Sequence, residues 1–489
     1  MVFSSIPFLF FFLPLCLVLY YLIPYKCKNT VLLIFSLIFY AWGEPVYILL
    51  LLFATLVDYC SGRLMTRFGT TAGRRRIFLI ISVGINLSVL AFFKYADFLI
   101  GTVNGIFNTS IEPLGLGLPV GISFFTFQTM SYTIDLYKGE VSVEKSYKDY
   151  LTYVSMFPQL VAGPIVRYAA VQKELRGRRI DRTEVYEGFL RFLRGLFKKV
   201  LLANNVGALW EEIHLLGVEG MSAASGMQAA AQMSAATAWL GAAAFTLQLY
   251  FDFSAYSDMA IGMGRMLGFH FSENFVYPLS SVSITDFWRR WHISLGTWFR
   301  DYVYIPLGGN RKGTVKHLRN MFVVWFLTGL WHGASWNFVL WGLYHGVLLA
   351  LEKYVWGERL KKLPKIFQHL YAVIIVVVGF VIFVCEDMGE IRLFISSMLL
   401  LAGNPLWGNE CLWYIKNYGV MLLVAAALAF PVYPWLKERL KRREEVLEDR
   451  SMRIRAAYVM SAVGYAALFF ASVAFLVSDT YNPFLYFRF

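Results

Sequence analysis

Apolar runs long enough to cross a lipid bilayer recur from one end of this 489-residue chain to the other. A membrane-spanning helix needs about 20 apolar residues. Only 16% of the residues are charged and the mean hydropathy is +0.55, whereas soluble domains carry about 25% charged residues. Within lipid, a helix satisfies all of its backbone polar groups internally. The pattern therefore predicts an all-α, polytopic membrane protein of about 11–13 transmembrane helices, with re-entrant or interfacial helices around a central tunnel.

The expected spans are of two kinds. Those before about residue 110 and after about 369 are plain runs of Leu, Ile, Val and Phe, whereas those between 118 and 346 contain Pro, Gly and polar residues. Interrupted segments are tolerated in membranes only inside protein or along a cavity, so we expect the functional centre in this middle part. The first run lacks a basic leading region and is interpreted as a retained span. The spans are expected near 5–23, 30–42, 45–60, 76–93, 118–137, 148–164, 187–207, 234–256, 319–332, 336–355, 369–385, 418–435 and 456–477.

The net charge of +13 is concentrated in short loops between the apolar runs, whereas residues 200–264 contain no Lys or Arg. The positive-inside rule therefore places the loops at 73–76, 173–182, 361–365 and 437–445 in the cytoplasm and residues 208–234 outside. This distribution is typical of membrane topology and contact with anionic lipid, and it argues against nucleic-acid binding. The five scattered cysteines contain no CxxC spacing and indicate neither a metal site nor a disulfide framework.

Polar residues share one face of two of the interrupted spans at 100° per residue. One interpretation is hydrogen bonding between helices, and the other is that these faces line a polar tunnel. Two carboxylates, Asp252 and Asp258, favour the tunnel because an acid within a membrane needs water or a cation. The first face consists of Gln128, Ser131, Tyr132 and Asp135, and the second of Tyr250, Ser254, Ser257 and Asp258.

Two other stretches depart from plain spans. "FPQLVAGPIVRY", residues 157–168, contains two prolines and is expected to be a kinked span ending at Arg167. Residues 285–313 are too charged to span and mix basic with aromatic residues, which is typical of an interfacial or re-entrant segment. That segment is either an anchor without chemistry or part of a site. Its candidate substrate-binding residues are Arg289, Arg290, Trp291, Arg300 and Asp301.

Two histidines, His332 and His345, lie within the run "LTGLWHGASWNFVLWGLYHG". On one straight helix they would differ by about 220° and could not share a pocket. The stretch "HGASWN" allows a break at about 333–336, which predicts two helices with His332 at the end of the first. A histidine in an apolar run is most often a packing residue, but it is also chemically suited to act as a general base. Metal binding is disfavoured because no second ligand follows at i+3 or i+4.

An ordered series of motifs resembles the membrane-bound O-acyltransferase family, in particular its bacterial branch that acylates alginate, peptidoglycan or teichoic acid. The resemblance implies that His332, in "WHG", is the acyl-transfer histidine and that His292, in "RRWHISL", assists it. His345 matches no catalytic position, so packing is expected for it, and His270 departs from the pattern without an assigned role. The matching stretches are "FKYADF", "GISFFTFQTMSYTIDLYKGE", "FPQLVAGPIVRY", "QLYFDFSAYSDMAIGMGRMLGFHFSENFVYPL", "DFWRRWHISLGTWFRDYVYIPLGGNR", "TGLWHGASWNFVLWGLYHG" and the terminal "NPFLYFRF".

The resemblance also implies one domain over 1–489, with a catalytic core near 93–346 and accessory helices near 369–489. It implies transfer of an acetyl group from acetyl-CoA, with no bound cofactor, to a cell-surface polysaccharide across a bacterial cell membrane, with an SGNH-type or alginate-type extracytoplasmic partner. Arg289, Arg290, Arg300 and Arg311 are candidates for holding the donor's phosphates or an acidic carrier protein. Further substrate-binding candidates are Gln128, Tyr250, Ser254, Asp258, Trp331 and Asn337.

Two alternatives remain open at this stage. The first, within the same chemistry, is transfer of D-alanine from a carrier protein to teichoic acid. The second is a proton-coupled exporter, which can also use histidine and aspartate within the membrane as a relay. An exporter of this kind is expected to contain inverted repeats, and none is visible in the sequence.

Overall fold

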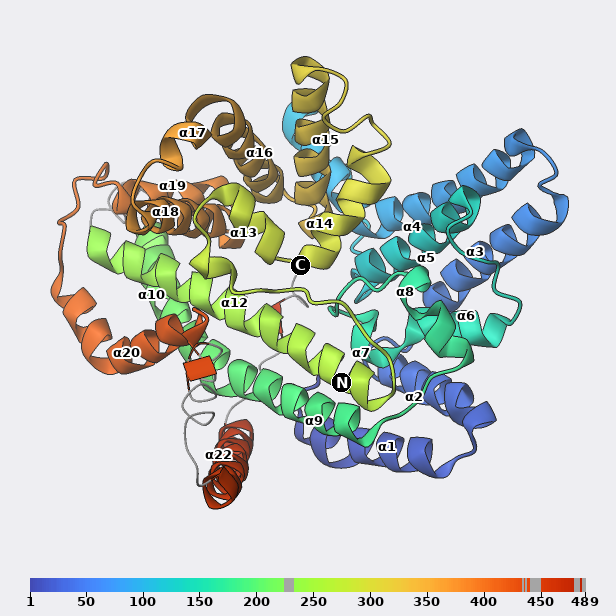
Figure 1. The fold of residues 1–489 in the computed structure, drawn as a ribbon. Helices are drawn as coiled ribbons and strands as arrows, with labels where there is room; N and C mark the ends of the chain where they lie inside the picture. The colour runs from blue at the N-terminus through green and yellow to red at the C-terminus, as the bar shows by residue number, and fades with distance from the viewer. Residues whose placement is uncertain (224–232, 433–434, 436–437, 440–449, 479–483, 486–489) are drawn as a thin grey trace.

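The computed structural model describes residues 1–489 except 224–232, 433–434, 436–437, 440–449, 479–483 and 486–489. Every regular element among the described residues is a helix (Figure 1). Five helices are long and apolar enough to cross a membrane, namely Ile48–Phe68, Ala72–Phe107, Lys365–Val384, Asn409–Leu428 and Val459–Ser478. The chain is therefore an all-α polytopic membrane protein, as predicted. The exact number of crossings, the tunnel and the domain bounds stay predictions.

The N-terminal helices form one side of the molecule (Figure 1). A polar network within this group surrounds Asp58 of α3, which accepts hydrogen bonds from Ser82, Asn86 and Thr133. These contacts satisfy a carboxylate that would otherwise be costly inside a membrane. The elements are η1 (Phe8–Phe12), α1 (Leu13–Leu22), η2 (Tyr25–Cys27), α2 (Lys28–Gly43), α3 (Ile48–Phe68), α4 (Ala72–Phe107), α5 (Ile122–Lys138), α6 (Tyr147–Ser155), α7 (Phe157–Leu160) and α8 (Tyr168–Arg176).

Two antiparallel segments, α9 with its continuation and α12, run side by side through the middle of the molecule (Figure 1). Glycine makes this approach possible, because a Cβ on Gly262 would lie 2.6 Å from the carbonyl oxygen of Gly188 and a Cβ on Gly188 equally close to that of Gly262. Small residues at a helix crossing are the usual means of close packing in membranes. The elements are α9 (Arg182–Phe197), η3 (Lys198–Ala203), α10 (Asn204–Ala223) and α12 (Ala235–Met266).

The two acids of α12 pair with cations of the adjacent segment. Asp258 accepts from Lys198 at 2.7 Å and from Arg191 at 2.9 Å, and Asp252 pairs with Lys199 at 2.6 Å where both side chains are buried. The backbone N–H of Leu485 also donates to Asp252, at 2.8 Å, so the end of the chain docks on this pair. The carboxylates thus join helices, and the tunnel interpretation that rested on them loses its support.

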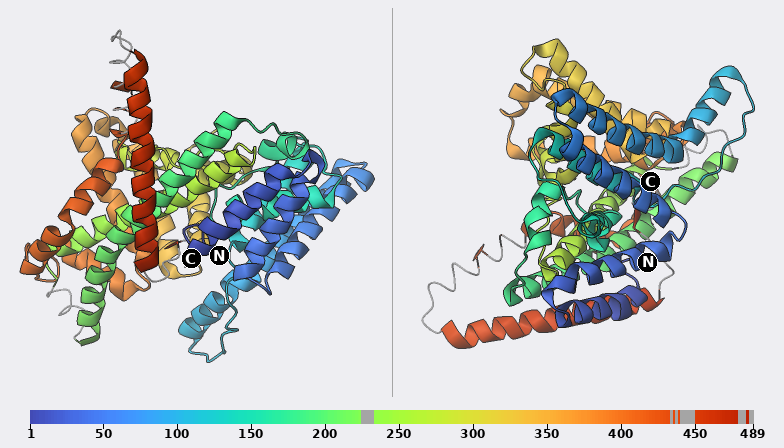
Figure 2. Two further views of the ribbon diagram at one scale, coloured as in Figure 1. Left: turned by 90° about the horizontal axis from the view of Figure 1, so that it is seen from below. Right: turned by 90° about the vertical axis from the view of Figure 1, so that its right-hand side faces the viewer.

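The remaining elements surround a helical hairpin made by α15 and α16 (Figure 1). Short helices α13 and α14 lie between this hairpin and α12 (Figure 1), whereas α22 lies along the lower edge of the molecule in the right-hand view of Figure 2. The elements are η4 (Pro278–Ser280), α13 (Ile284–Arg290), α14 (Ile293–Phe299), η5 (Arg300–Tyr304), α15 (Thr314–His332), α16 (Trp336–Leu351), η6 (Glu352–Trp356), α17 (Gly357–Leu360), α18 (Lys365–Val384), α19 (Met388–Met398), α20 (Asn409–Leu428) and α22 (Arg450–Ser478).

Two expectations about local structure have clear outcomes. The predicted break near 333–336 is confirmed, since α15 ends at His332 and α16 begins at Trp336. The prediction of one kinked span over 148–164 is wrong, because α6 ends at Ser155 and α7 covers only Phe157–Leu160. Proline cannot donate a backbone hydrogen bond in a helix interior, and two of them within seven residues leave this segment irregular. The predicted cytoplasmic loop at 437–445 falls largely outside the described residues. Of the segment 208–234 that was predicted to face outside, residues up to Ala223 belong to α10 and 224–232 lie outside the described residues.

Two apolar cores meet at the hairpin. Trp331, at the end of α15, belongs to the core formed mainly by the N-terminal helices. Trp341, on α16, belongs to the second core, which α10, α12, α18 and α19 build. His332 lies beside both rings, with centroid separations of 5.0 Å to Trp331 and 4.9 Å to Trp341. The fold therefore positions His332 where its two halves join.

Candidate active site

His332 is the last residue of α15 and is only 5% exposed. The chain leaves it in an extended conformation at Gly333 and turns directly into α16. A Cβ on Gly333 would lie 2.0 Å from the ring of Phe338, so only glycine lets the turn close this tightly. The "WHG" sequence therefore places a histidine at the end of a helix and in the interior of the protein.

Two side chains of α4 hold the end of α15 in place. The buried ammonium of Lys94 donates to the carbonyl oxygen of Trp331 at 2.5 Å, to that of His332 at 3.4 Å and to Ser123 Oγ at 3.2 Å. Tyr95 donates its hydroxyl to the carbonyl of Leu330 at 2.6 Å. The last carbonyls of a helix have no partner within it, and a cation there is favourable. The "FKYADF" motif thus caps the helix that carries His332.

His292 lies between α13 and α14 in the left-handed conformation, with φ 45° and ψ 52°. Asn274 Oδ1 accepts from Ser294 N at 3.1 Å and lies 3.2 Å from His292 Nδ1. Because a backbone N–H can only donate, the Asn274 atom must be oxygen, and the Nδ1 of a neutral His292 must carry the proton. Its Nε2 then has no proton and is able to accept one. A non-glycine residue held at positive φ is often found at functional sites.

The two histidines that were predicted to be catalytic, His292 and His332, both contact the ring of Trp331. The ring centroid of Trp331 lies 5.7 Å from that of His292 and 5.0 Å from that of His332. Phe253 of α12 packs edge-on against His292 at 4.8 Å. Residues some forty positions apart in the sequence therefore line one buried, largely aromatic site, which is the arrangement that the motifs implied.

His345 has a different environment. It is 1% exposed, and Trp288 donates its indole N–H to His345 Nδ1 at 3.3 Å. On the other side, a Cβ on Gly379 of α18 would lie 2.9 Å from His345 Nε2. Both ring nitrogens are thus enclosed by packed helices, and Trp341 separates this ring from His332. The contacts fit the predicted packing role.

The other polar candidates near the histidines differ in what they contact. Asn337 donates to the carbonyls of Phe383 and Cys385 at 3.2 and 2.9 Å, which ties the start of α16 to the end of α18. Gln128 is fully buried, and neither polar atom of its side chain has a partner among the described residues. Trp291 packs between Phe287 and Phe275 at 5.5 and 5.1 Å. Gln128 thus leaves both polar atoms of its side chain unused, and Asn337 leaves only its Oδ1 unused.

The candidates on α12 are divided between helix packing and the site. Tyr250 is buried with its ring 6.4 Å from that of Trp291, so it reaches the outer layer of the site. Ser254 donates to the carbonyl of Phe251 within its own helix, at 3.5 Å. Asp258 is held by Arg191 and Lys198, which makes helix pairing its observed role.

The arginines predicted to bind phosphate are already engaged in part. Arg290 pairs with Asp286 at 2.9 Å, and Arg300 pairs with Asp301 at 2.7 Å. The structure describes no such partner for Arg289 or Arg311, and both stay candidates on charge alone.

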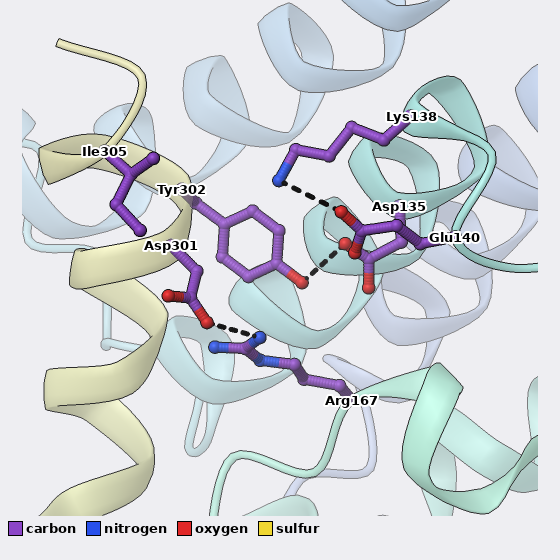
Figure 3. Close-up of a pocket in the computed structure, with 7 residues that line it drawn as sticks. All are labelled: Asp135, Lys138, Glu140, Arg167, Asp301, Tyr302 and Ile305. Carbon is purple, nitrogen blue, oxygen red and sulfur yellow. Dashed lines mark hydrogen bonds and ion pairs between the residues drawn. The ribbon is translucent and has the colours of Figure 1, made fainter. Parts of the chain in front are cut away.

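A polar pocket of about 200 Å³ lies beside η5, lined by Asp135, Lys138, Glu140, Arg167, Asp301, Tyr302 and Ile305 (Figure 3). Tyr302 donates to Asp135 at 2.7 Å, and Arg167 pairs with Asp301 at 2.9 Å. Burial acts to raise the pKa of Asp301, but hydrogen bonds and charges from Arg300 and Arg167 outweigh it and hold that pKa below its ordinary value. The prediction missed Arg167 as a pocket residue, because it was interpreted only as the end of a span.

His270, the departure from the family pattern, lies away from this site. Its Nδ1 is 2.7 Å from Glu174 Oε1, and its backbone N–H donates to the same carboxylate at 3.2 Å. The side chain is 56% exposed. It therefore links α8 to the segment after α12.

Comparison with known proteins identifies the chemistry of this arrangement. The model of the membrane-bound O-acyltransferase family matches residues 126–389, a range that contains His292 and His332. The chain belongs to this family. It is 38% identical to the "Probable alginate O-acetylase AlgI" of Pseudomonas putida over the full length of both chains. It is also 32% identical to the "Peptidoglycan O-acetyltransferase" of Helicobacter pylori, over 83% of this chain and 81% of the relative.

Similarity to a third relative is more limited. The "Teichoic acid D-alanyltransferase" of Bacillus subtilis is 26% identical over 54% of this chain and 66% of its own length. The family membership establishes that the chain is a membrane-embedded acyltransferase. The alternative of a proton-coupled exporter is therefore wrong. Lys94 and Tyr95 lie outside the matched range, and their role follows from the structure alone.

Proposed function

We propose that this enzyme moves an acetyl group from acetyl-CoA in the cytoplasm to a hydroxyl of a cell-surface polysaccharide, with His332 as the general base. The observation that carries the proposal is the pair of buried histidines that both contact the ring of Trp331. The full-length similarity to proteins named for alginate and peptidoglycan O-acetylation supports acetate as the acyl group. The half-length similarity to a D-alanyl transferase makes that activity the less favoured one.

The reaction requires one proton to move twice. His332 takes the proton of the acceptor hydroxyl while its oxygen attacks the carbonyl carbon of the thioester. The C–O bond forms, and the electron pair of the C=O bond moves onto oxygen. When that pair returns, the C–S bond breaks, and the thiolate leaves with its electrons and receives the proton from His332. His292, fixed by Asn274, orients the partners from its position beside Trp331.

The two substrates reach the site from opposite sides. The basic residues at the start of α15 follow the positive-inside pattern, and α15 extends from there to His332 over 19 residues, about 28 Å at 1.5 Å each. The thioester enters from the basic, cytoplasmic side, where Arg289 and Arg311 are the candidates for its phosphates. The acceptor approaches from the outer side, presented by an extracytoplasmic partner of the SGNH or alginate type in a bacterial cell membrane.

The test is the acetate content of envelope polysaccharide in cells that express the chain. We expect alkali-labile acetate with the wild type and near-background acetate with His332→Gln at equal membrane abundance. A general base typically contributes roughly 10²–10⁴-fold, so glutamine cannot replace it. Normal acetate with His332→Gln would remove this residue from the reaction. Release of D-alanine in place of acetate would establish the teichoic-acid activity instead.

A further inference from the structure

The buried and half-buried tryptophans of this protein differ in the partner of the indole N–H. That group only donates, and leaving it buried without an acceptor is unfavourable. The indoles of Trp239, Trp288, Trp298 and Trp356 all donate to an oxygen or nitrogen within 3.3 Å. By contrast, the Nε1 atoms of Trp331 and Trp341 are buried without any acceptor among the described residues.

The unpartnered donor of Trp331 lies at the centre of the site. This ring is 4% exposed and contacts both His292 and His332, at centroid separations of 5.7 and 5.0 Å. Phe124 and Phe127 close its other sides at 5.2 and 5.8 Å. Trp341 lies equally close to His332, at 4.9 Å, but its ring packs on the packing residue His345, at 5.1 Å. Among the described tryptophans, Trp331 is therefore the one with an unpartnered N–H whose ring contacts both histidines.

We propose that the indole N–H of Trp331 is a catalytic hydrogen-bond donor to the carbonyl oxygen of the thioester. This inference rests on the proposed function. As the hydroxyl oxygen bonds to the carbonyl carbon, the C=O electron pair becomes a negative charge on that oxygen, which Trp331 stabilises by donating its proton without transferring it. The charge is lost when the C=O bond reforms and the thiolate leaves. An oxygen that acquires charge only in the transition state is what a preorganised, otherwise idle donor stabilises best.

The experiment compares the wild type with variants in which the side chain of residue 331 has no indole N–H. One variant is Trp331→Phe, and the second replaces Trp331 by 3-benzothienylalanine, which keeps the two fused rings and substitutes sulfur for N–H. Trp239→Phe is the matched control, because it also removes an indole N–H. That N–H is bonded to the carbonyl of Met398 at 3.0 Å and lies on α12, whereas Trp331 lies on α15. Each protein is purified in lipid nanodiscs and mixed with an alginate oligosaccharide, which supplies the acceptor hydroxyl. Release of the free thiol from acetyl-CoA is then followed with a thiol-reactive dye. His332→Gln measures the background.

Both Trp331 variants should lose about 10²–10³-fold in kcat with KM for acetyl-CoA nearly unchanged, as for removal of other oxyanion donors. Their stability should not fall because of the missing N–H, since no bond is lost on removing an unpartnered donor. Trp239→Phe should show the reverse, lower stability with normal turnover per folded protein.

If thiol release by the wild type depends on His332 and the benzothienyl variant has the same kcat, the proposed role of Trp331 is wrong while the proposed function stands. A large rise in KM with unchanged kcat would also overturn that role, because it would place the contact in substrate binding. A wild type that releases no thiol above the His332→Gln background would instead reject the proposed function.

Discussion

Lys94 provides the sharpest test of how the catalytic helix is held in place. Methionine at this position keeps the length and the apolar stem of the side chain but removes all three donors. The carbonyls of Trp331 and His332 then lose the ammonium that lies 2.5 and 3.4 Å away. Each unpaired buried carbonyl costs about 1–3 kcal/mol, and the lost cation at a helix C-terminus adds up to about 2 kcal/mol. Methionine also avoids the cost of burying a charged ammonium, which offsets part of this loss. The expected net loss of unfolding free energy is about 2–4 kcal/mol.

The assay is unfolding of purified Lys94→Met in mixed micelles by titration with a denaturing detergent, together with turnover per folded protein. A misplacement of about 1 Å at a reacting group can cost about 10²-fold, so turnover should fall by about 10- to 100-fold. Tyr95→Phe is the graded companion, since it removes one hydrogen bond, to Leu330 at 2.6 Å, and should cost about 1 kcal/mol. Wild-type stability and turnover in Lys94→Met would refute the capping argument.

Three further predictions follow from individual contacts. His345→Gln should keep most of its turnover and lose about 1–2 kcal/mol with the Trp288 bond; a loss equal to that of His332→Gln, measured by the same acetate assay, would contradict the packing role. Gly262→Ala should lower stability by about 1–3 kcal/mol, because its Cβ would meet the Gly188 carbonyl at 2.6 Å, whereas Gly101→Ala, with open space within 4 Å, should not; equal unfolding curves would remove the crossing constraint. Asp301 has a lowered pKa in the folded protein. The difference in unfolding free energy between the wild type and Asp301→Asn should therefore be constant above about pH 5, where the carboxyl is ionised in both the folded and the unfolded state, and should vanish as the pH falls through the folded pKa. A difference that grows on acidification would contradict this assignment.

Several features of the site were predictable because they depend on local chemistry. The break after His332 follows from the small and polar residues of "HGASWN", and the two catalytic candidates follow from motifs that are contiguous in the sequence. The irregular course of 157–168 was harder to predict. The prolines indicated a kink, but the loss of the helix depends on how much backbone the surrounding protein can satisfy.

The roles of charged residues could not be assigned in the same way. Lys94 and Asn274 both lie in stretches that the motif series includes, yet nothing in their neighbourhood shows that one caps a helix more than 230 residues away and the other fixes the proton of His292. The acids of α12 were expected to line a tunnel because a carboxylate in a membrane needs a partner. That requirement is correct, but the partners are lysine and arginine of the neighbouring segment.

Hydropathy and short motifs act over a few residues at a time, so they were enough to predict the membrane environment, the helical class and His332 as a candidate for acyl transfer. They could not predict which polar groups have hydrogen-bond partners in the folded chain and which have none. A hydrogen bond depends on positions within about 3 Å, which are set by helices packed from distant parts of the chain. The indole N–H can therefore be a hydrogen-bonded structural donor at Trp298 and an unpartnered donor at Trp331. The two side chains are chemically the same, and only their surroundings differ.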